Sequence, residues 1–233
     1  MWIKDKLACL VTKKITREKL DLFLKKHSTG GKTLDIGCGN VPYVSYFPNS
    51  VTIDVSRLRK PAILADAHCL PFGNESFDVI LCTEVLEHLK EPQWAIDEME
   101  RVLLDGGKVV LTTRFIFPLH DTPDDYYRFT KYGLRYLLRN WRIVEIKEET
   151  STLGSIAVLF QRMGFQSNFR VPLLEIFPYI VARFLLWLDF IARFLIREEY
   201  GVFYEKIPEK GIMTSGYYVI AEKCKTQKEE GKS

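Results

Sequence analysis

The chain has 233 residues, the size of one ordinary domain, and 47% of them are hydrophobic, which is enough for a sizeable core. Its formal net charge of +3 is small for a protein that binds a phosphate backbone, so composition argues against a nucleic-acid partner. The five cysteines are odd in number and lack Cys-x-x-Cys spacing, which favours neither a disulfide framework nor a zinc site. The cytoplasm is the simplest compartment, because the apolar patch at 7–11 is too short for a secretory signal.

Segments of helical and strand character alternate through the first half of the chain. Apolar residues and lysines recur at helical spacing over 12–27, which predicts a basic amphipathic helix. Strands are then predicted at 33–37, 50–54, 62–65, 77–82 and 107–114, with helices after Asn40 and at 92–103. Strands that alternate with helices pair in parallel, so the sequence predicts an α/β fold with a doubly wound sheet.

The second half of the chain continues the pattern and then departs from it. A helix is predicted near 130–139, opened by Thr130 as its N-cap, and strands are predicted near 142–149 and at 216–223. The intervening segment 151–212 is much longer than a hairpin connection. A connection of that length usually carries structure or function of its own.

Within this insertion, residues 171–196 are strongly apolar. Four charged residues interrupt the stretch: Glu175, Arg183, Asp189 and Arg193. They exclude a simple transmembrane span. On a helical wheel one arc gathers the polar residues Tyr179, Arg183, Asp189, Arg193 and Arg197. The wide apolar remainder favours an interfacial helix that contacts a membrane surface through 171–197, and a lid packed on its own domain or on the second subunit of a homodimer stays open.

The most informative segment is the glycine turn Thr33-Leu34-Asp35-Ile36-Gly37-Cys38-Gly39. A strand enters the turn, and the next strand ends at Asp54, which is the layout of a nucleotide-type site. Glycine at 37 and 39 lets the backbone approach a ligand closely. The carboxylate of Asp54 can accept hydrogen bonds from two vicinal ribose hydroxyls. Strand-to-helix turns also use glycine for purely local reasons.

Three further motifs follow the turn in order. They are Asp66-Ala67-His68-Cys69-Leu70-Pro71-Phe72 with Ser76-Phe77-Asp78, then Glu84-Val85-Leu86-Glu87-His88-Leu89, then Asp105-Gly106-Gly107. Over roughly residues 30–140 the series resembles the class I S-adenosylmethionine-dependent methyltransferases, in particular the methyltransferase type 11-like group. The resemblance implies a Rossmann-like, seven-stranded, mostly parallel sheet with a helical insertion before an antiparallel last strand. It also implies S-adenosylmethionine as the cofactor, without a metal.

The resemblance further implies which residues hold the cofactor. They are Asp35, Gly37, Cys38 and Gly39 under its amino-acid part, Asp54 and Val55 at the ribose, Asp66 and Ala67 at the adenine, and Cys82 and Glu84 at the methionine moiety. The third glycine common in the family is absent, because Asn40-Val41-Pro42 follows Gly39. We therefore interpret the turn as a variant of the family loop.

The loop 115–130 follows the fifth predicted strand and should face the acceptor, since ligands of open α/β sheets bind outside the carboxyl ends of strands. His120 is a candidate general base, and Tyr126 and Arg128 are candidate acceptor contacts. Alternatively, the loop satisfies its own charges, with an aspartate paired to Arg128. The segment resembles one found in methyltransferases often associated with glycan and surface-polysaccharide pathways.

The sequence thus predicts a methyltransferase that acts on a small-molecule or glycan acceptor, with a lipid-linked acceptor included. Its alternatives are a lipid or quinone methyltransferase and a non-catalytic cofactor-binding scaffold. Nucleic acid is not expected as a partner, because no basic stripe with interleaved aromatic residues is evident in the core. The predicted regions are a helical cap at 1–29, the cofactor-binding core at 30–150, the apolar insertion at 151–212, the final core strand at 213–224 and a disordered tail at 225–233. The predicted location is cytoplasmic, with membrane association if the insertion contacts lipid.

Overall fold

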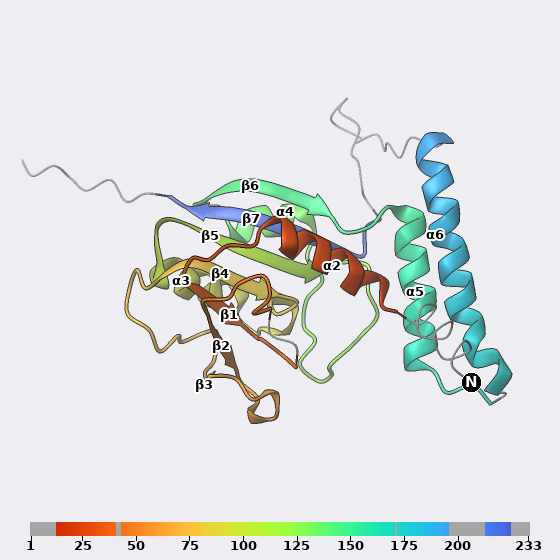
Figure 1. Cartoon of the computed structure of the whole chain (residues 1–233), viewed down its shortest axis with the longest axis horizontal. Helices are drawn as coiled ribbons and strands as arrows, with labels where there is room; N and C mark the ends of the chain where they lie inside the picture. Colours follow the sequence, from red (N-terminus) through yellow and green to blue (C-terminus); the bar gives the residue numbers. More distant parts are fainter. Residues whose placement is uncertain (1–12, 41–42, 171, 196–212, 225–233) are drawn as a thin grey trace, which may run out of the picture. The chain divides into compact units, whose positions relative to one another are not determined.

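The computed structural model describes residues 13–40, 43–170, 172–195 and 213–224 (Figure 1). Its strands are β1 (Thr33–Ile36), β2 (Ser50–Asp54), β3 (Ile63–Leu64), β4 (Phe77–Thr83), β5 (Leu103–Arg114), β6 (Trp141–Glu148) and β7 (Gly216–Lys223). Its α-helices are α2 (Ile15–Lys26), α3 (Pro92–Val102), α4 (Lys131–Leu137), α5 (Thr152–Gln166) and α6 (Phe177–Leu195). Short 3-10 helices are η1 (Arg57–Arg59), η2 (Leu86–His88) and η3 (Pro172–Ile176). The apolar patch at 7–11, Arg197 and the predicted tail at 225–233 lie outside the described residues.

The strands form one seven-stranded sheet in the order β3-β2-β1-β4-β5-β7-β6. Parallel pairing joins β1 to β2 and β4, β2 to β3, and β4 to β5. β7 runs opposite to β5 and β6 (Figure 1). The predicted mostly parallel, Rossmann-like sheet with a reversed last strand is confirmed. Because β1 lies between β2 and β4, the strand order changes direction beside β1, and such switch points open a crevice for ligands.

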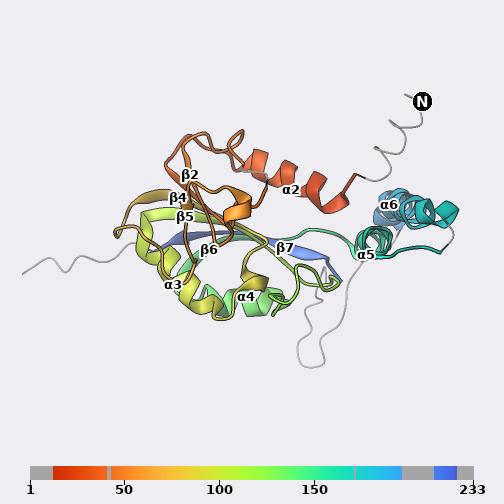
Figure 2. The same ribbon diagram turned by 90° about the horizontal axis from the view of Figure 1, so that it is seen from below.

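The central strands are buried because helices cover a parallel sheet and leave little of it to water. All four residues of β1 are buried, as are all of β4 except Asp78. On α3, buried side chains recur at Ala95, Ile96, Met99 and Val102, an amphipathic pattern, and Pro92 opens the helix where its missing N–H costs nothing. α3 and α4 lie on the same face of the sheet (Figure 2).

Arg101, near the end of α3, ties the helix to the segment that follows β3. Its guanidinium donates to the backbone oxygens of Leu70 (3.0 Å) and Phe72 (2.8 Å) and to the Asn74 side chain (3.1 Å). Its Nε donates to the Glu98 carboxylate at 2.6 Å, and Glu98 accepts from the Leu70 backbone N–H at 2.7 Å. A charged fork of this kind fixes the path of the loop.

Most predicted elements are confirmed, with two corrections: the helix after Asn40 and the start of the fifth strand. The N-cap at Thr130 is confirmed, since its hydroxyl accepts from the Gly133 N–H at 3.0 Å. The helix predicted after Asn40 is wrong: the described residues 43–49 form turns, with one helical-type bond from the Phe47 N–H to the Tyr43 oxygen (2.9 Å). Pro48 disfavours a helical conformation at the residue before it, which limits this segment to a single turn. The fifth strand begins at Leu103 rather than at 107, because α3 runs into it directly.

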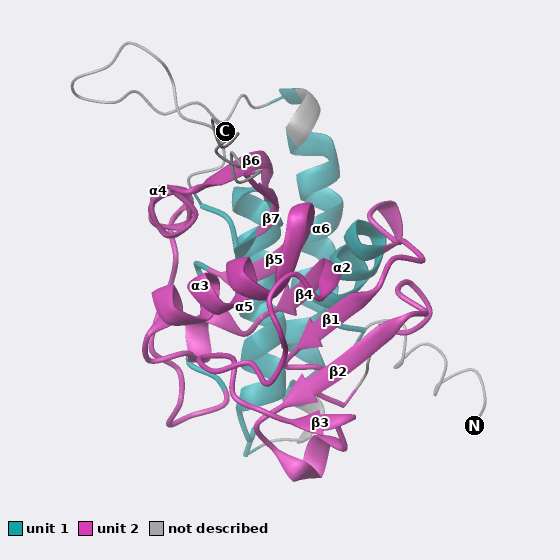
Figure 3. Ribbon diagram, turned by 90° about the vertical axis from the view of Figure 1, so that its left-hand side faces the viewer, with its two compact units in different colours: residues 1–24, 115–120, 148–217 teal, residues 25–114, 121–147, 218–233 magenta. Residues whose placement is uncertain are grey.

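The chain divides into two compact units (Figure 3). The first unit comprises residues 1–24, 115–120 and 148–217, and the second comprises 25–114, 121–147 and 218–233. In the first unit α5 packs on α6, with Ala157, Val158 and Ala182 buried together with Ile15. Among the described residues, no helix combines the length and the apolar character that a membrane-spanning segment requires.

Candidate active site

A pocket of about 740 Å³ lies within the second unit, at the carboxyl ends of β1, β2 and β4. Its walls include the predicted cofactor residues Gly37, Gly39, Asp54, Val55, Asp66, Ala67 and Glu84. Three other predicted residues, Asp35, Cys38 and Cys82, are buried and do not line it. The structure therefore brings most of the predicted set together around one cavity.

The glycine turn has a backbone conformation at Gly37 and Gly39 that residues other than glycine rarely adopt. Gly37 has φ +67°, and a Cβ added there would lie 2.4 Å from Cγ2 of Val85. Gly39 has φ +58°, but an added Cβ would meet nothing within 4 Å, because it faces the open pocket. Gly37 is thus required by the fold of the turn, whereas Gly39 leaves space that a ligand can fill.

Asp54 joins the turn to the end of β2. Its Oδ2 accepts from the Gly39 N–H at 3.2 Å, and its Oδ1 accepts from the Ser56 N–H at 2.8 Å. Each carboxylate oxygen can accept a second hydrogen bond. The carboxylate is therefore held in a fixed orientation from behind and offers its remaining lone pairs to hydroxyl groups in the pocket.

Asp35 lies beneath the turn with 1% of its surface exposed. Among the described residues, neither carboxylate oxygen has a hydrogen-bond partner of ordinary geometry. Burial raises the pKa of Asp35 to about 7, the Tyr43 backbone N–H offsets this only in part, and the charge of Asp54 adds to it. An uncompensated buried carboxyl next to a pocket favours a cationic ligand group there.

Asp66 is oriented by the residue that follows it by two positions. Its Oδ1 accepts from the His68 backbone N–H at 2.9 Å and lies 2.6 Å from the His68 ring Nδ1. Burial raises the pKa of Asp66, but these two hydrogen bonds outweigh it and hold that pKa below its usual range. His68 also lines the pocket, and it supports Asp66 rather than standing alone.

Two glutamates follow β4. Glu84 has φ +56°, lines the pocket and forms an ion pair with the buried Arg114. Glu87 is fully buried and accepts from the Thr113 hydroxyl at 2.7 Å. Burial, followed by the charge of Glu84, raises the pKa of Glu87. The two carboxyl groups of one short motif therefore have different environments, one paired at the pocket wall and one enclosed.

The part of the pocket opposite the glycine turn, here called the far end, is formed by the loop after β5 and by the end of η2 with the residues that follow it. It is lined by His88, Lys90, Asp121, Thr122, Asp124 and Tyr126. The Tyr126 hydroxyl donates to Asp124 Oδ1 at 2.6 Å, and His88 Nδ1 donates to the Asp124 backbone oxygen at 2.6 Å. The Tyr126 backbone N–H donates to the Glu87 oxygen at 2.8 Å, so the loop is fixed to the turn after β4.

The three predicted acceptor-side residues differ in placement. Tyr126 lines the pocket. Arg128 does not: its guanidinium makes two 2.7 Å hydrogen bonds to Asp125, the self-satisfied arrangement that the sequence left open. His120 belongs to the first unit, so its role as a base remains a prediction. Sequence reasoning missed Lys90 and Asp124; the tyrosine two residues after Asp124 could have indicated that aspartate, and no signal marked Lys90.

The sheet topology and the pocket define the class of protein, a Rossmann-like α/β domain with a ligand-sized pocket at the carboxyl ends of its strands. Residues 34–111 match the family described as "Methyltransferase domain". This segment therefore forms a methyltransferase domain of the class I type, whose cofactor is S-adenosylmethionine.

Curated relatives match about 35–40% of the chain. The uncharacterized protein MJ1123 of Methanocaldococcus jannaschii is 35% identical over 96 residues, 38% of this chain and 47% of that protein. The demethylmenaquinone methyltransferase of Renibacterium salmoninarum is 33% identical over 96 residues, 35% of this chain and 40% of that protein. The tRNA (carboxymethyluridine(34)-5-O)-methyltransferase of Arabidopsis thaliana is 33% identical over 107 residues, 40% of this chain and 26% of that protein. The chain spans less than half the length of each of these relatives.

The comparisons correct one expectation and support the fold. Because a relative is named for a tRNA substrate, composition alone does not exclude nucleic acid as a partner. Among solved structures, an S-adenosylmethionine-dependent methyltransferase of Thermotoga maritima, titled a possible histamine N-methyltransferase, has a TM-score of 0.55 and 16% identity. The alignment covers 94% of this chain and 95% of that chain, and at such identity it shows the fold alone.

The residues present fit this cofactor. The open space at Gly39 would admit its amino-acid part, Asp54 would offer oxygens to its ribose hydroxyls, and the buried Asp35 carboxyl, only partly compensated by the Tyr43 N–H, would suit its positive charge. Asp66, held by His68, would offer its second oxygen to the adenine. When bound, S-adenosylmethionine supplies an electrophilic methyl group.

Asp35 should couple cofactor binding to a proton. Its pKa rises from 3.8 to about 7 on folding, so between these values the native chain binds more protons than the unfolded one, and Asp35 lowers stability as pH rises through that window. A cationic ligand favours the ionised form, so binding at pH 6.5 should release about half a proton or more. Calorimetry in buffers of different ionisation enthalpy should detect this release in the wild type and not in Asp35→Asn.

Glu87→Gln is the matched control for this measurement, because Glu87 also has a raised pKa but is enclosed away from the pocket lining. It should leave the proton release unchanged. Release that persists in Asp35→Asn would contradict the assignment.

Proposed function

We propose that the protein transfers the methyl group of S-adenosylmethionine to a hydroxyl of a polar small molecule or glycan, including a lipid-linked glycan. The observation that carries this proposal is the polar far end of the pocket, where carboxylates and a tyrosine stand next to the cofactor residues. Carboxylate oxygens accept hydrogen bonds from sugar hydroxyls, and a tyrosine ring gives an apolar face for a sugar ring. The polar lining thus suits an uncharged, hydroxyl-rich acceptor better than an anionic one.

The residues at this end have separable tasks. The carboxylates of Asp121 and Asp124 would accept hydrogen bonds from hydroxyl groups of the substrate and so fix its orientation. Tyr126, held by Asp124, would cover the acceptor and exclude water. Lys90 Nζ lies 6.0 Å from the centre of the Tyr126 ring and helps to fix that ring. In-line positioning of this kind supplies much of the catalysis of a methyl displacement.

A general base would complete the site. His120 keeps this role in the proposal on its chemistry, because a neutral imidazole can remove a hydroxyl proton near pH 7. The sequence places it directly before Asp121.

The proposal is tested by formation of S-adenosylhomocysteine with a panel of sugars and nucleotide sugars, a demethylated quinone, and tRNA. With an active sugar, Asp124→Asn and Tyr126→Phe should each lower kcat/KM by about tenfold or more, since the first removes the charge of the acceptor group and the second removes the hydroxyl that donates to it. Affinity for S-adenosylmethionine should not change. Tyr136→Phe is the control, because Tyr136 is an exposed tyrosine on α4 outside the pocket.

Each outcome of the panel discriminates between functions. Turnover with tRNA and not with sugars would replace the proposed acceptor. Cofactor binding without turnover on any acceptor would favour the non-catalytic scaffold.

A second candidate is methylation of a lipid or quinone. It is favoured by the exposed apolar side chains of α6 in the first unit and by the relative named as a demethylmenaquinone methyltransferase. Preferential turnover of the demethylated quinone would support it over the glycan.

A further inference from the structure

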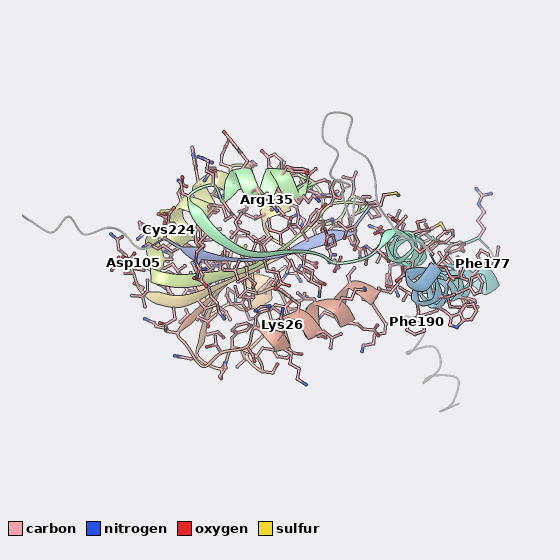
Figure 4. The ribbon with its side chains drawn as sticks, turned by 90° about the horizontal axis from the view of Figure 1, so that it is seen from above. Lys26, Asp105, Arg135, Phe177, Phe190 and Cys224 are labelled. Carbon is pink, nitrogen blue, oxygen red and sulfur yellow. The ribbon has the colours of Figure 1, made fainter. Side chains whose placement is uncertain are left out.

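The helix α6 has apolar side chains both on the side that packs within the first unit and on the side that faces outward. Ala182 and Asp189 are buried, whereas the exposed described side chains of the helix are all apolar. These are Phe177, Ile180, Phe184, Trp187, Phe190 and Leu195, here called the outer face (Phe177 and Phe190 are labelled in Figure 4). A soluble helix normally buries its apolar side. The second, outward apolar side of α6 therefore needs an explanation.

Three described polar residues of α6 contact other residues of the first unit. Arg183 donates to the Lys13 backbone oxygen at 2.8 Å and lies 3.6 Å from the Glu18 carboxylate. Asp189 accepts from the hydroxyl of Ser151 at the N-terminus of α5. Tyr179 packs against Gly164, where an added Cβ would lie 2.7 Å from the tyrosine ring. These contacts fix the rotation of α6 about its axis, so the outer face is a fixed property of the unit.

We propose that the outer face docks on the surface of a phospholipid bilayer and lies in the interface without crossing it. The six side chains are between 53% and 79% exposed, and Phe184 stacks on Trp187 with ring centres 5.9 Å apart. A helix of 19 residues is about 28 Å long, so it offers a continuous apolar stripe to the acyl chains below the headgroups.

The chemistry of the outer face favours lipid over a second protein. Its only hydrogen-bonding side-chain group is the indole N–H of Trp187, and none of its described residues is charged. Protein interfaces carry about one hydrogen bond per 100–200 Å², which this face does not provide. Acyl chains require none, and tryptophan suits the boundary between headgroups and acyl chains.

The charge beside the face complements anionic headgroups. Arg183 is three residues after Ile180 and four before Trp187, so it lies along the border of the face. Glu18 is shared by Arg183 and by Lys13, whose Nζ lies 3.4 Å from it, which leaves this group with one net positive charge. The exposed Arg170 adds another, and the exposed Glu175 opposes it. The border thus favours a bilayer that contains anionic lipid.

Vesicle flotation of the full chain tests the proposal without cofactor or acceptor. The wild type should bind phosphatidylcholine vesicles and bind more tightly when they contain phosphatidylglycerol. Trp187→Ser and Phe184→Ser should each lower the partition coefficient by about tenfold, because each removes a large apolar side chain from the contact. Trp94→Ser is the matched control, since Trp94 is a 61% exposed tryptophan on α3. It should bind like the wild type.

Sedimentation velocity without lipid tests whether a second copy of the chain covers the outer face instead of a bilayer. A monomer that binds vesicles supports the proposal. A dimer that Trp187→Ser dissociates, together with no vesicle binding, would assign the face to a second copy and overturn it. Absence of vesicle binding by the monomer, or equal loss in Trp94→Ser, would also overturn it.

Discussion

Asp54→Ala is expected to weaken binding of S-adenosylmethionine by at least about a hundredfold. The carboxylate would accept hydrogen bonds from the two ribose hydroxyls, and a hydrogen bond to a charged group contributes about 1.5–3 kcal/mol, so two of them correspond to two or more orders of magnitude in Kd. The substitution also frees the Gly39 and Ser56 N–H groups that Asp54 now accepts from, which loosens the glycine turn. Calorimetric titration with S-adenosylmethionine and S-adenosylhomocysteine measures the effect.

Asp97→Ala provides the comparison, because Asp97 is an exposed aspartate on α3 that accepts a hydrogen bond from the Gln93 side chain and does not line the pocket. It should bind the cofactor like the wild type. Asp54→Asn should fall between the two, since an amide keeps one acceptor oxygen and loses the charge. Wild-type affinity in Asp54→Ala would remove the ribose assignment and with it the main support for the pocket as a cofactor site.

Gly37→Ala is expected to lower stability, whereas Gly39→Ala is expected mainly to lower affinity for the cofactor. At Gly37 the positive φ costs about 1–2 kcal/mol, and the clash with Val85 adds about 1–3 kcal/mol, so the free energy of unfolding should fall by about 2–5 kcal/mol. At Gly39 only the backbone cost applies, because the added methyl group meets nothing within 4 Å. That methyl group would occupy the pocket, so Gly39→Ala should lose cofactor affinity with a much smaller loss of stability.

Chemical denaturation and cofactor titration of both variants measure this contrast. Val85→Ala combined with Gly37→Ala should recover the steric part of the loss and leave the backbone part. Equal stability of the two single variants would show that the Val85 contact does not constrain the turn.

The sheet and the cofactor end of the pocket could be predicted because their signals are local. Short apolar runs bounded by turns gave β1, β2 and β4, and the glycines with Asp54 follow from what a tight turn beside a ribose requires. The helix after Asn40 could not be predicted correctly by the alternation rule, because a proline at 48 limits that segment and overrides the pattern.

The remaining features depend on contacts between residues distant in sequence. The wheel separated the polar and apolar arcs of α6, but the contacts of Arg183 and Asp189 depend on the Lys13 backbone, Glu18 and Ser151. The lack of a partner at Asp35 and the pairing of Arg128 with Asp125 also need coordinates. Sequence spacing specifies which side chains share a face, but it does not specify what that face meets.

The hydrogen bonds of Arg101 connect the loop 70–74 to α3, so these two segments form one rigid unit. The loop 70–74 follows the adenine-side residues Asp66 and Ala67, and the guanidinium on α3 holds its backbone oxygens from behind. Substitutions that change the path of this loop should therefore occur together with substitutions at positions 98 and 101. Homologues that replace the arginine should carry a compensating change in the loop, so the shape of the pocket wall beside Asp66 and Ala67 is inherited jointly with a helix whose residues do not line the pocket.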